Sequence, residues 1–284
     1  MKQLVTFATL LIFSISALAG GPWLYSKKAG FYQLQSTFVT APYTSVLQGS
    51  ASDRVHLNRE VFTNDFGGYA EYGLSNRINL IGKLPIKYVS TGALNDSLYN
   101  PTLLEEGNLL GLSNIELGAK YGVINKGVKL ALSVNTIWNT IRTDLDKGLV
   151  TGYNYNAVGL FAHVGGGLGE RGYLYTDVGY VVTSNNFSDY FQEHVELGYR
   201  IGEALWLKMT LDVKRSMENG SYFNENLRQT GIHPNDQDWV GFGFGASYEF
   251  KNKVGINFTT GGAVRASSVG LSPPVTIGVY KKVG

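Results

Sequence analysis

The chain has no cysteine and few charged side chains, since Asp, Glu, Lys and Arg make up 16% of its 284 residues. Without cysteine it forms no disulfide framework and carries no lipid-modified cysteine, so its stability must come from hydrogen bonds and packing. After the N-terminal region, the sequence holds no run of about 18 apolar residues, the length that a transmembrane helix requires. The sequence therefore excludes a bundle of membrane-spanning helices.

Charge of one sign is also missing, because 24 Lys and Arg stand against 22 Asp and Glu. A net charge of +2, without a basic run or zinc-finger spacing, predicts no nucleic-acid partner. The best metal candidate, Asp144 with Asp146, lacks the remaining oxygen ligands of a calcium loop. We therefore expect no metal and no cofactor.

Glycine and aromatic residues are abundant, with 36 Gly, 18 Tyr and 14 Phe, a composition that suits aromatic-rich strands. Residues 69–88 predict a β-hairpin that turns at 75–77. On its second limb, Leu80, Leu84 and Ile86 share one parity, and Lys83 and Lys87 share the other. Because successive strand side chains point to opposite faces, this limb has one apolar face and one charged face.

The same alternation recurs along the chain and predicts about twelve strands. They lie in the ranges 30–40, 69–88, 114–139, 154–183, 190–215, 239–265 and 275–280, and the polar stretch at 53–59 is read as a connection. Short turns alternate with long connections. An even strand number, this alternation and apolar-out, polar-in strands are typical of bacterial outer-membrane barrels. The predicted fold class is therefore all-β, a transmembrane antiparallel β-barrel of about 12 strands. A soluble sandwich is the alternative, but its regular long and short connections would be coincidental.

The N-terminus predicts export. Lys2, an apolar run and the sequence Ala17-Leu18-Ala19 are typical of a cleaved signal peptide over residues 1–19. Residues 20–284 then form the barrel domain, surrounded by outer-membrane lipid. Only about ten residues separate Gly20 from the first strand, so we expect no plug domain.

One parity of nearly every strand carries charged residues, which we predict to line the lumen. They are Glu71, Lys83, Lys87, Glu116, Lys120, Lys129, Asp177, His194, Glu196, Arg200, Lys208, Asp212, Glu249 and Arg265. Because both signs are interleaved, we expect salt bridges across neighbouring strands, whereas an ion-selective ring would carry one sign. Twelve strands leave a narrow passage. Pro85, on the inward parity, is either a tolerated local irregularity or a bulge or kink that narrows the lumen or opens the wall.

Catalysis is not predicted. His163 and His194 belong to the lumen parity, and His194 can pair with Asp212 across a hairpin. A nucleophilic mechanism also needs a serine within hydrogen-bond reach, and the sequence places none there. His233 lies in a long late connection and is read as an ordinary loop residue.

Two stretches resemble a known family. The sequences YGLSNRINL at 72–80 and GLSNIELGAKY at 111–121 are similar to outer-membrane proteins of the phenol meta-degradation pathway type, over roughly strands two to five. The resemblance implies a barrel related to fatty-acid and aromatic-hydrocarbon channels, which take up small apolar compounds. The chain departs from this pattern in lacking a plug domain and in its Lys281-Lys282-Val283-Gly284 ending, where Tyr280 is the candidate for the terminal aromatic residue.

Two functions stay open. The first is an outer-membrane channel for the passive passage of small molecules, hydrophobic or aromatic ones included. The second is a non-conducting structural or interaction barrel, whose external loops at 92–111 and 217–237 dock an envelope or secretion partner. The apolar anchors of such docking would be Leu98, Tyr99, Leu103, Leu104, Tyr222 and Phe223. Loops of this length can instead fold inward as a constriction.

Overall fold

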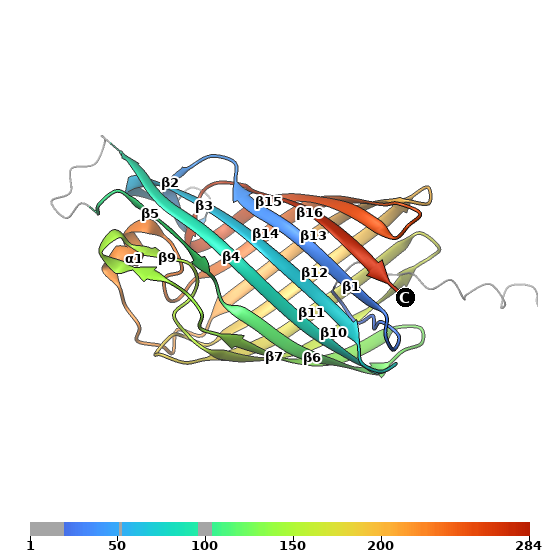
Figure 1. The fold of residues 1–284 in the computed structure, drawn as a ribbon. Helices are drawn as coiled ribbons and strands as arrows, with labels where there is room; N and C mark the ends of the chain where they lie inside the picture. Colours follow the sequence, from blue (N-terminus) through green and yellow to red (C-terminus); the bar gives the residue numbers. More distant parts are fainter. Residues whose placement is uncertain (1–19, 51–52, 96–103) are drawn as a thin grey trace, which may run out of the picture.

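The computed structural model of the chain describes residues 20–50, 53–95 and 104–284, so the predicted signal peptide at 1–19 lies outside the described residues. Twelve antiparallel strands form a closed barrel (Figure 1). In order around the wall, the strands are β1 (Gly30–Val39), β3 (Arg54–Gly73), β4 (Ile78–Leu94), β6 (Ile115–Ile124), β7 (Lys129–Trp138), β10 (Ala157–Leu168), β11 (Gly172–Thr183), β12 (Tyr190–Ile201), β13 (Leu205–Ser216), β14 (Asp238–Glu249), β15 (Val254–Gly270) and β16 (Pro274–Val283). The barrel closes where β1 pairs with β16, and this confirms the predicted fold class.

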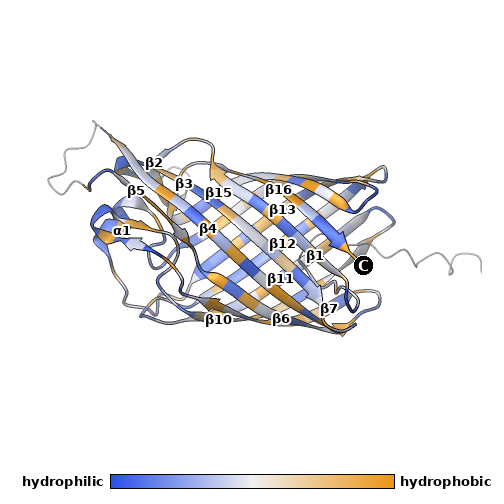
Figure 2. Ribbon diagram, viewed as in Figure 1, coloured by the Kyte–Doolittle hydropathy of each residue, from blue (hydrophilic) through white to orange (hydrophobic). Residues whose placement is uncertain are grey.

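Alternating side chains give the barrel an apolar outside and a polar inside. On β4, Leu80 and Leu84 are exposed on the outer surface, whereas Asn79 and Lys87 are buried inside. Figure 2 shows apolar and polar bands alternating along the strands. The same exposure holds around the wall for Leu117, Leu132, Leu160, Leu197, Met209 and Phe244. A closed ladder with an apolar exterior satisfies both demands of a bilayer, because the backbone groups are paired within the wall and lipid contacts the apolar side chains. Among the residues that the structure describes, no helix is long and apolar enough to cross a membrane.

Short turns gather at one end of the barrel and long connections at the other. The short turns are 74–77, 125–128, 169–171, 202–204 and 250–253, and the longer connections include 139–156 and 217–237. Gly127 and Gly202 adopt φ angles of 63° and 61°, and an added Cβ would meet nothing within 4 Å. Glycine is favoured in these two turns because of the left-handed backbone and not because of space. The five predicted short turns are present, but the connection 271–273 between β15 and β16 at the loop end is short too, because β15 extends to Gly270 beyond its predicted end.

Extra strands reinforce the loop end. β2 (Tyr43–Ser50) pairs with both β3 and β15, and β5 (Gly107–Leu112) pairs with β4. Reading 53–59 as a connection was wrong, since β3 already begins at Arg54. Val55 and Leu57 alternate there with Arg54, His56 and Asn58, so the sequence carries a short period-two signal that Arg59 interrupts. The strand forms there because β2 pairs with its edge.

The loop end is filled by inward-folded connections. They contain β8 (Thr143–Asp144), the 3-10 helix η1 (Leu145–Lys147), β9 (Leu149–Val150) and α1 (Glu225–Thr230), which lie together with β2 and β5 at one end of the barrel in Figure 1. Their apolar side chains and those of the wall form one buried cluster of Tyr43, Val46, Leu57, Val61, Val89, Leu149, Val150, Leu227 and Ile232. This cluster is an apolar core inside the barrel mouth.

One predicted lumen residue lies on the other face. Across β14 and β15, Val240 opposes Arg265, but Gly241 opposes Ala263, so the register shifts by one residue at a β-bulge. Arg265 is exposed and shares the outward parity of Val240. The prediction that Arg265 lines the lumen was wrong, because the bulge reverses the alternation beyond Val264.

Candidate functional site

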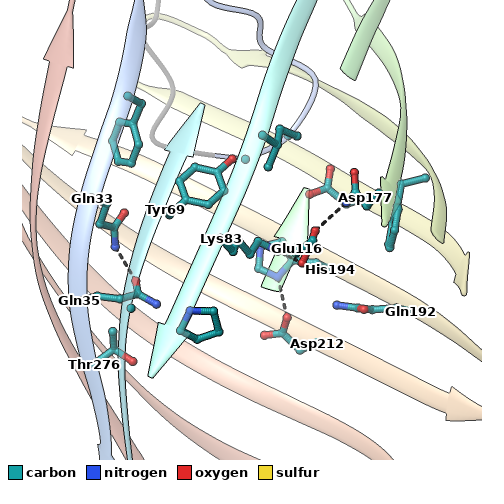
Figure 3. A pocket seen from close by; sticks show the side chains of 18 of the residues that line it. Gln33, Gln35, Tyr69, Lys83, Glu116, Asp177, Gln192, His194, Asp212 and Thr276 are labelled. Carbon is teal, nitrogen blue, oxygen red and sulfur yellow. Dashed lines mark hydrogen bonds and ion pairs between the residues drawn. The ribbon is translucent and has the colours of Figure 1, made fainter. Parts of the chain in front are cut away.

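A chamber of about 650 Å³ lies inside the barrel (Figure 3). Seven of the predicted lumen residues line it: Lys83, Glu116, Lys120, Asp177, His194, Lys208 and Asp212. Pro85 lines it as well, so its predicted inward direction is confirmed. The chamber has room for a small molecule.

The segment 20–25 covers the short-turn end from within the lumen. Gly20 and Gly21 line the chamber, and Lys120 Nζ donates a hydrogen bond of 3.1 Å to the carbonyl of Gly21. The ring of Trp23 meets those of Tyr173 and Tyr175 edge-on, with centroid distances of 5.6 Å and 5.4 Å. The sequence predicted no plug domain, and this segment of six residues is not a domain, but it lies inside the lumen at this end of the barrel.

The loop 217–237 covers the other end. Leu227 and Ile232 are buried in the mouth, and the Thr230 hydroxyl donates to the carbonyl of Gly148 at 2.8 Å. This loop therefore folds inward as a constriction. Of its proposed docking anchors, Tyr222 stacks on Phe187 at a centroid distance of 4.1 Å, and Phe223 is 64% exposed.

The other proposed loop, 92–111, is described only in part. Leu98, Tyr99 and Leu103 lie outside the described residues, and Leu104 is buried. Arg59 donates to the carbonyl of Leu104 at 2.6 Å. Among the anchors that the structure describes, Phe223 thus offers the largest exposed apolar side chain.

The interleaved charges form ion pairs, as the mixed signs predicted; five of them join neighbouring strands, whereas Lys120 with Glu71 and Lys282 with Glu249 each reach across one intervening strand. Their N to O distances are 2.8 Å for Lys83 with Glu116, 2.7 Å for Lys120 with Glu71, 3.7 Å for Lys208 with Glu196, 3.2 Å for Lys87 with Asp65, 2.7 Å for His194 with Asp212, 2.7 Å for His163 with Asp177 and 2.5 Å for Lys282 with Glu249. Since cations and anions alternate in these pairs, the described residues form no lumenal ring of one sign.

The remaining predicted residues lie away from the chamber. Lys129 Nζ donates to the carbonyl of Asn125 at 2.8 Å, in the adjacent short turn. The Arg200 guanidinium lies over the ring of Trp206 at 5.7 Å. Both side chains therefore support the short-turn end instead of contacting a solute in the chamber.

Neutral side chains complete the lining. Sequence reasoning did not name most of them as site residues: the amides of Gln33, Gln35, Asn114, Asn135, Gln192 and Asn257, and the rings of Phe31, Tyr69, Phe161, Tyr175, Tyr190 and Tyr280. The lumen parity was a usable signal for all of them. Tyr280 is 2% exposed and stacks on Phe31, so its ring lies inside the barrel and cannot act as a lipid-facing terminal aromatic.

His163 belongs to a hydrogen-bonded chain along the barrel wall. Ser133 Oγ lies 2.9 Å from His163 Nε2, and His163 Nδ1 lies 2.7 Å from Asp177. A serine within reach of a histidine had not been found in the sequence, because the register of β7 against β10 brings it there. The backbone amides of these strands belong to the ladder, so none is available to form an oxyanion hole here. The Ser133 chain is therefore a structural network.

Comparisons with known proteins agree with this fold. No protein-family model matches the chain, and no curated protein matches it in sequence. The COG4313 outer membrane channel from Pseudomonas putida F1 is similar, with a TM-score of 0.70, 14% identity, and coverage of 94% of this chain and 100% of that chain. A NanC porin (TM-score 0.52, 8% identity, 89% and 100% covered) and the β-domain of the Bordetella autotransporter Brka (TM-score 0.51, 12% identity, 90% and 100% covered) are also similar.

At these identities the likeness is one of fold. The chain has the fold of an outer-membrane β-barrel, and the resemblance to outer-membrane channels seen in the sequence is confirmed at that level.

Proposed function

We propose that the protein is a channel of the bacterial outer membrane through which small molecules, hydrophobic or aromatic compounds included, pass passively. It reaches the membrane by export, with residues 1–19 as a cleaved signal peptide. Lipid surrounds its apolar outer face.

The chamber carries this proposal. Its volume of about 650 Å³ lies within the range of about 300–1,000 Å³ that is usual for small-molecule sites. It lies between two covers, the segment 20–25 and the loop 217–237, and both must move for a solute to pass. The likeness to a solved outer membrane channel supports the same function.

The lining indicates how solutes are selected. Paired charges such as Lys83 with Glu116 leave no net charge for an ion to follow. Aromatic rings and amides remain as the neutral contacts, and they suit an uncharged ring compound better than an ion. The lumenal charges therefore act as a structural lining and set the size of the passage.

The test is conductance of the purified protein in planar bilayers, together with swelling of liposomes in solutions of small neutral solutes. The variant carrying Lys83→Ala and Glu116→Ala widens the chamber, so its conductance and swelling rate should exceed those of the unchanged protein. The matched control carries Lys126→Ala and Glu203→Ala, which also removes one cation and one anion, at two exposed positions in the short turns. Equal effects of the two double variants would contradict passage through the chamber.

Docking of an envelope partner is the second candidate. The exposed Phe223, with the Arg228 guanidinium 5.5 Å from its ring centre, is the observation that favours it. A correctly folded barrel that stays silent in both assays, and that loses a co-purifying envelope protein on Phe223→Ala, would establish docking in place of passage.

A further inference from the structure

The loop 217–237 brings His233 into contact with the barrel wall just above the chamber. His233 Nε2 lies 3.0 Å from Lys87 Nζ on β4, and its ring lies 4.4 Å from that of Tyr153, centre to centre. Lys87 lies two residues from the chamber residue Pro85 on β4. His233 also has a φ of 47°, a left-handed conformation that is strained for histidine and persists only where its surroundings hold it.

This contact fixes the protonation state of the imidazole. A lysine ammonium can only donate hydrogen bonds, so Nε2 must accept and carry no proton. The carboxylate of Asp65 lies 3.2 Å from Lys87 Nζ and forms an ion pair with it. The inward position of the loop therefore requires a neutral His233.

A second cation faces His233 from the opposite wall. Lys214 on β13 donates to the Tyr153 hydroxyl at 3.0 Å, and its Nζ lies over the rings of Tyr153, Tyr190 and Trp239 at 4.3 Å, 4.4 Å and 5.0 Å. Tyr190 lines the chamber too. The His233 loop thus lies between the amino groups of Lys87 and Lys214 at the outer end of the chamber.

The anions nearby are already engaged. Asp65 forms an ion pair with Lys87. Asp238 favours the charged form of Lys214 and accepts a hydrogen bond from the backbone N–H of Ser216. On the loop itself, Asp236 accepts from the hydroxyls of Ser188 and Ser216 at 2.6 Å and 2.9 Å. Burial, and after it the charges of Lys87 and Lys214, hold the pKa of His233 well below its usual value. A proton on His233 would meet like charge from both walls.

We propose that His233 is a pH-sensitive latch, which keeps the loop 217–237 in the barrel mouth while the imidazole is neutral and releases the loop when it takes up a proton. The effect of this release on passage rests on the proposed channel function, but the movement of the loop does not.

The direction of the effect follows from the two protonation states. A released His233 in water has a pKa of about 6.5, whereas the inward one binds a proton much more weakly. Above about pH 6.5 the imidazole is neutral in both forms, and pH does not act on the loop through His233. Below it, the released loop is favoured about tenfold per pH unit, until the pH reaches the pKa of the inward histidine.

The experiment measures release of the loop directly, using the natural absence of cysteine. A cysteine is introduced by Ile232→Cys, at a position that is 3% exposed, and its rate of reaction with a water-soluble maleimide is followed in the folded barrel. Division by the rate for Phe223→Cys, a 64% exposed position in the same loop, removes the pH dependence of the thiol itself. The ratio should rise up to about tenfold between pH 7 and pH 5.5.

Two histidine variants test whether His233 causes the pH dependence of the labelling ratio. His233→Gln keeps an acceptor for Lys87 but cannot be charged, so the ratio should stay constant with pH. His56→Gln, in an exposed histidine that pairs with Ser45 at 3.1 Å, should leave the response unchanged. The latch is overturned if the ratio stays constant in the His233 protein while the barrel stays folded, or if it rises equally in His233→Gln.

A disulfide lock links the movement to passage. A Cβ built on Gly231 lies 3.7 Å from the Cβ of Val46, close to the usual spacing of about 3.8 Å in a disulfide. Val46→Cys with Gly231→Cys should therefore hold the oxidised loop closed at pH 5.5, and reduction should restore acid-induced conductance. If labelling responds to pH but the protein shows no conductance, the latch is supported and the channel is contradicted. If conductance is the same at both pH values, in the locked protein and in His233→Gln, the latch is overturned.

Discussion

The Lys120 ammonium and the Glu71 carboxylate lie 2.7 Å apart inside the barrel, and their side chains are 2% and 1% exposed. Glu71 also accepts from Asn79 at 2.6 Å and from the Tyr69 hydroxyl at 2.9 Å. Lys120 donates in addition to the carbonyl of Gly21. This network connects the wall to the N-terminal segment, so the pair serves stability and closure at once.

Loss of one partner of this buried ion pair should lower the stability of the barrel. Glu71→Gln leaves the buried Lys120 ammonium without its counter-charge, so we expect the free energy of unfolding in lipid vesicles to fall by about 3–5 kcal/mol. Lys83→Met is the control, because Lys83 pairs with Glu116 but its side chain is 48% exposed, and it should cost about 1 kcal/mol or less. Urea titration followed by tryptophan fluorescence measures both, and equal costs would show that burial does not decide the strength of these pairs.

Removal of the Trp23 ring should open the short-turn end. Trp23→Ala deletes two edge-on aromatic contacts, worth about 1 kcal/mol each, that hold the segment 20–25 in the lumen. Single-channel recording should show open periods at least tenfold more frequent. Trp138→Ala removes a tryptophan that is 53% exposed on the outer face, and it should change nothing. If both tryptophan variants behave alike, the segment does not limit passage.

Much of the wall follows from local alternation in the sequence. Lys83 faces the lumen and Leu84 the outside because side chains in a regular strand cannot do otherwise. The pairing of His194 with Asp212 needed only the register that the short turn at 202–204 imposes on β12 and β13. Fold class, strand number and most of the charged lining were therefore predictable.

The rest depends on contacts between distant parts of the chain. Arg265 follows a bulge, and one inserted residue reverses every later side chain. Leu227 and Ile232 look like ordinary loop residues until the barrel mouth supplies Val46 and Leu149 as partners. The role proposed for His233 depends on its contact with Lys87, which lies 146 positions away in the sequence. Such pairings leave no periodic trace in a single sequence.

The Phe161 ring depends on the missing side chain of Gly179. These two residues face each other across β10 and β11, and a Cβ on Gly179 would collide with the ring, which lines the chamber. Gly179→Val should push the ring into the chamber and lower conductance, at a cost of about 1–3 kcal/mol in stability. The second substitution Phe161→Ala should restore conductance. Gly262→Val is the control, since a Cβ there meets nothing within 4 Å; a similar loss of conductance would mean that the effect is not local.

The orientation of the wall can be tested with one charge placed on either face. Met209 on β13 is 53% exposed on the outer surface, whereas Gln192 on β12 lines the chamber. Met209→Arg puts a guanidinium against lipid near the middle of a strand, and we expect it to lower the free energy of unfolding by about 2–4 kcal/mol in vesicles. Gln192→Arg puts the same group in the polar lumen, where it should cost less and should change ion selectivity. A larger stability loss for Gln192→Arg would mean that the apolar face does not contact lipid, and the barrel would have to be soluble or inverted.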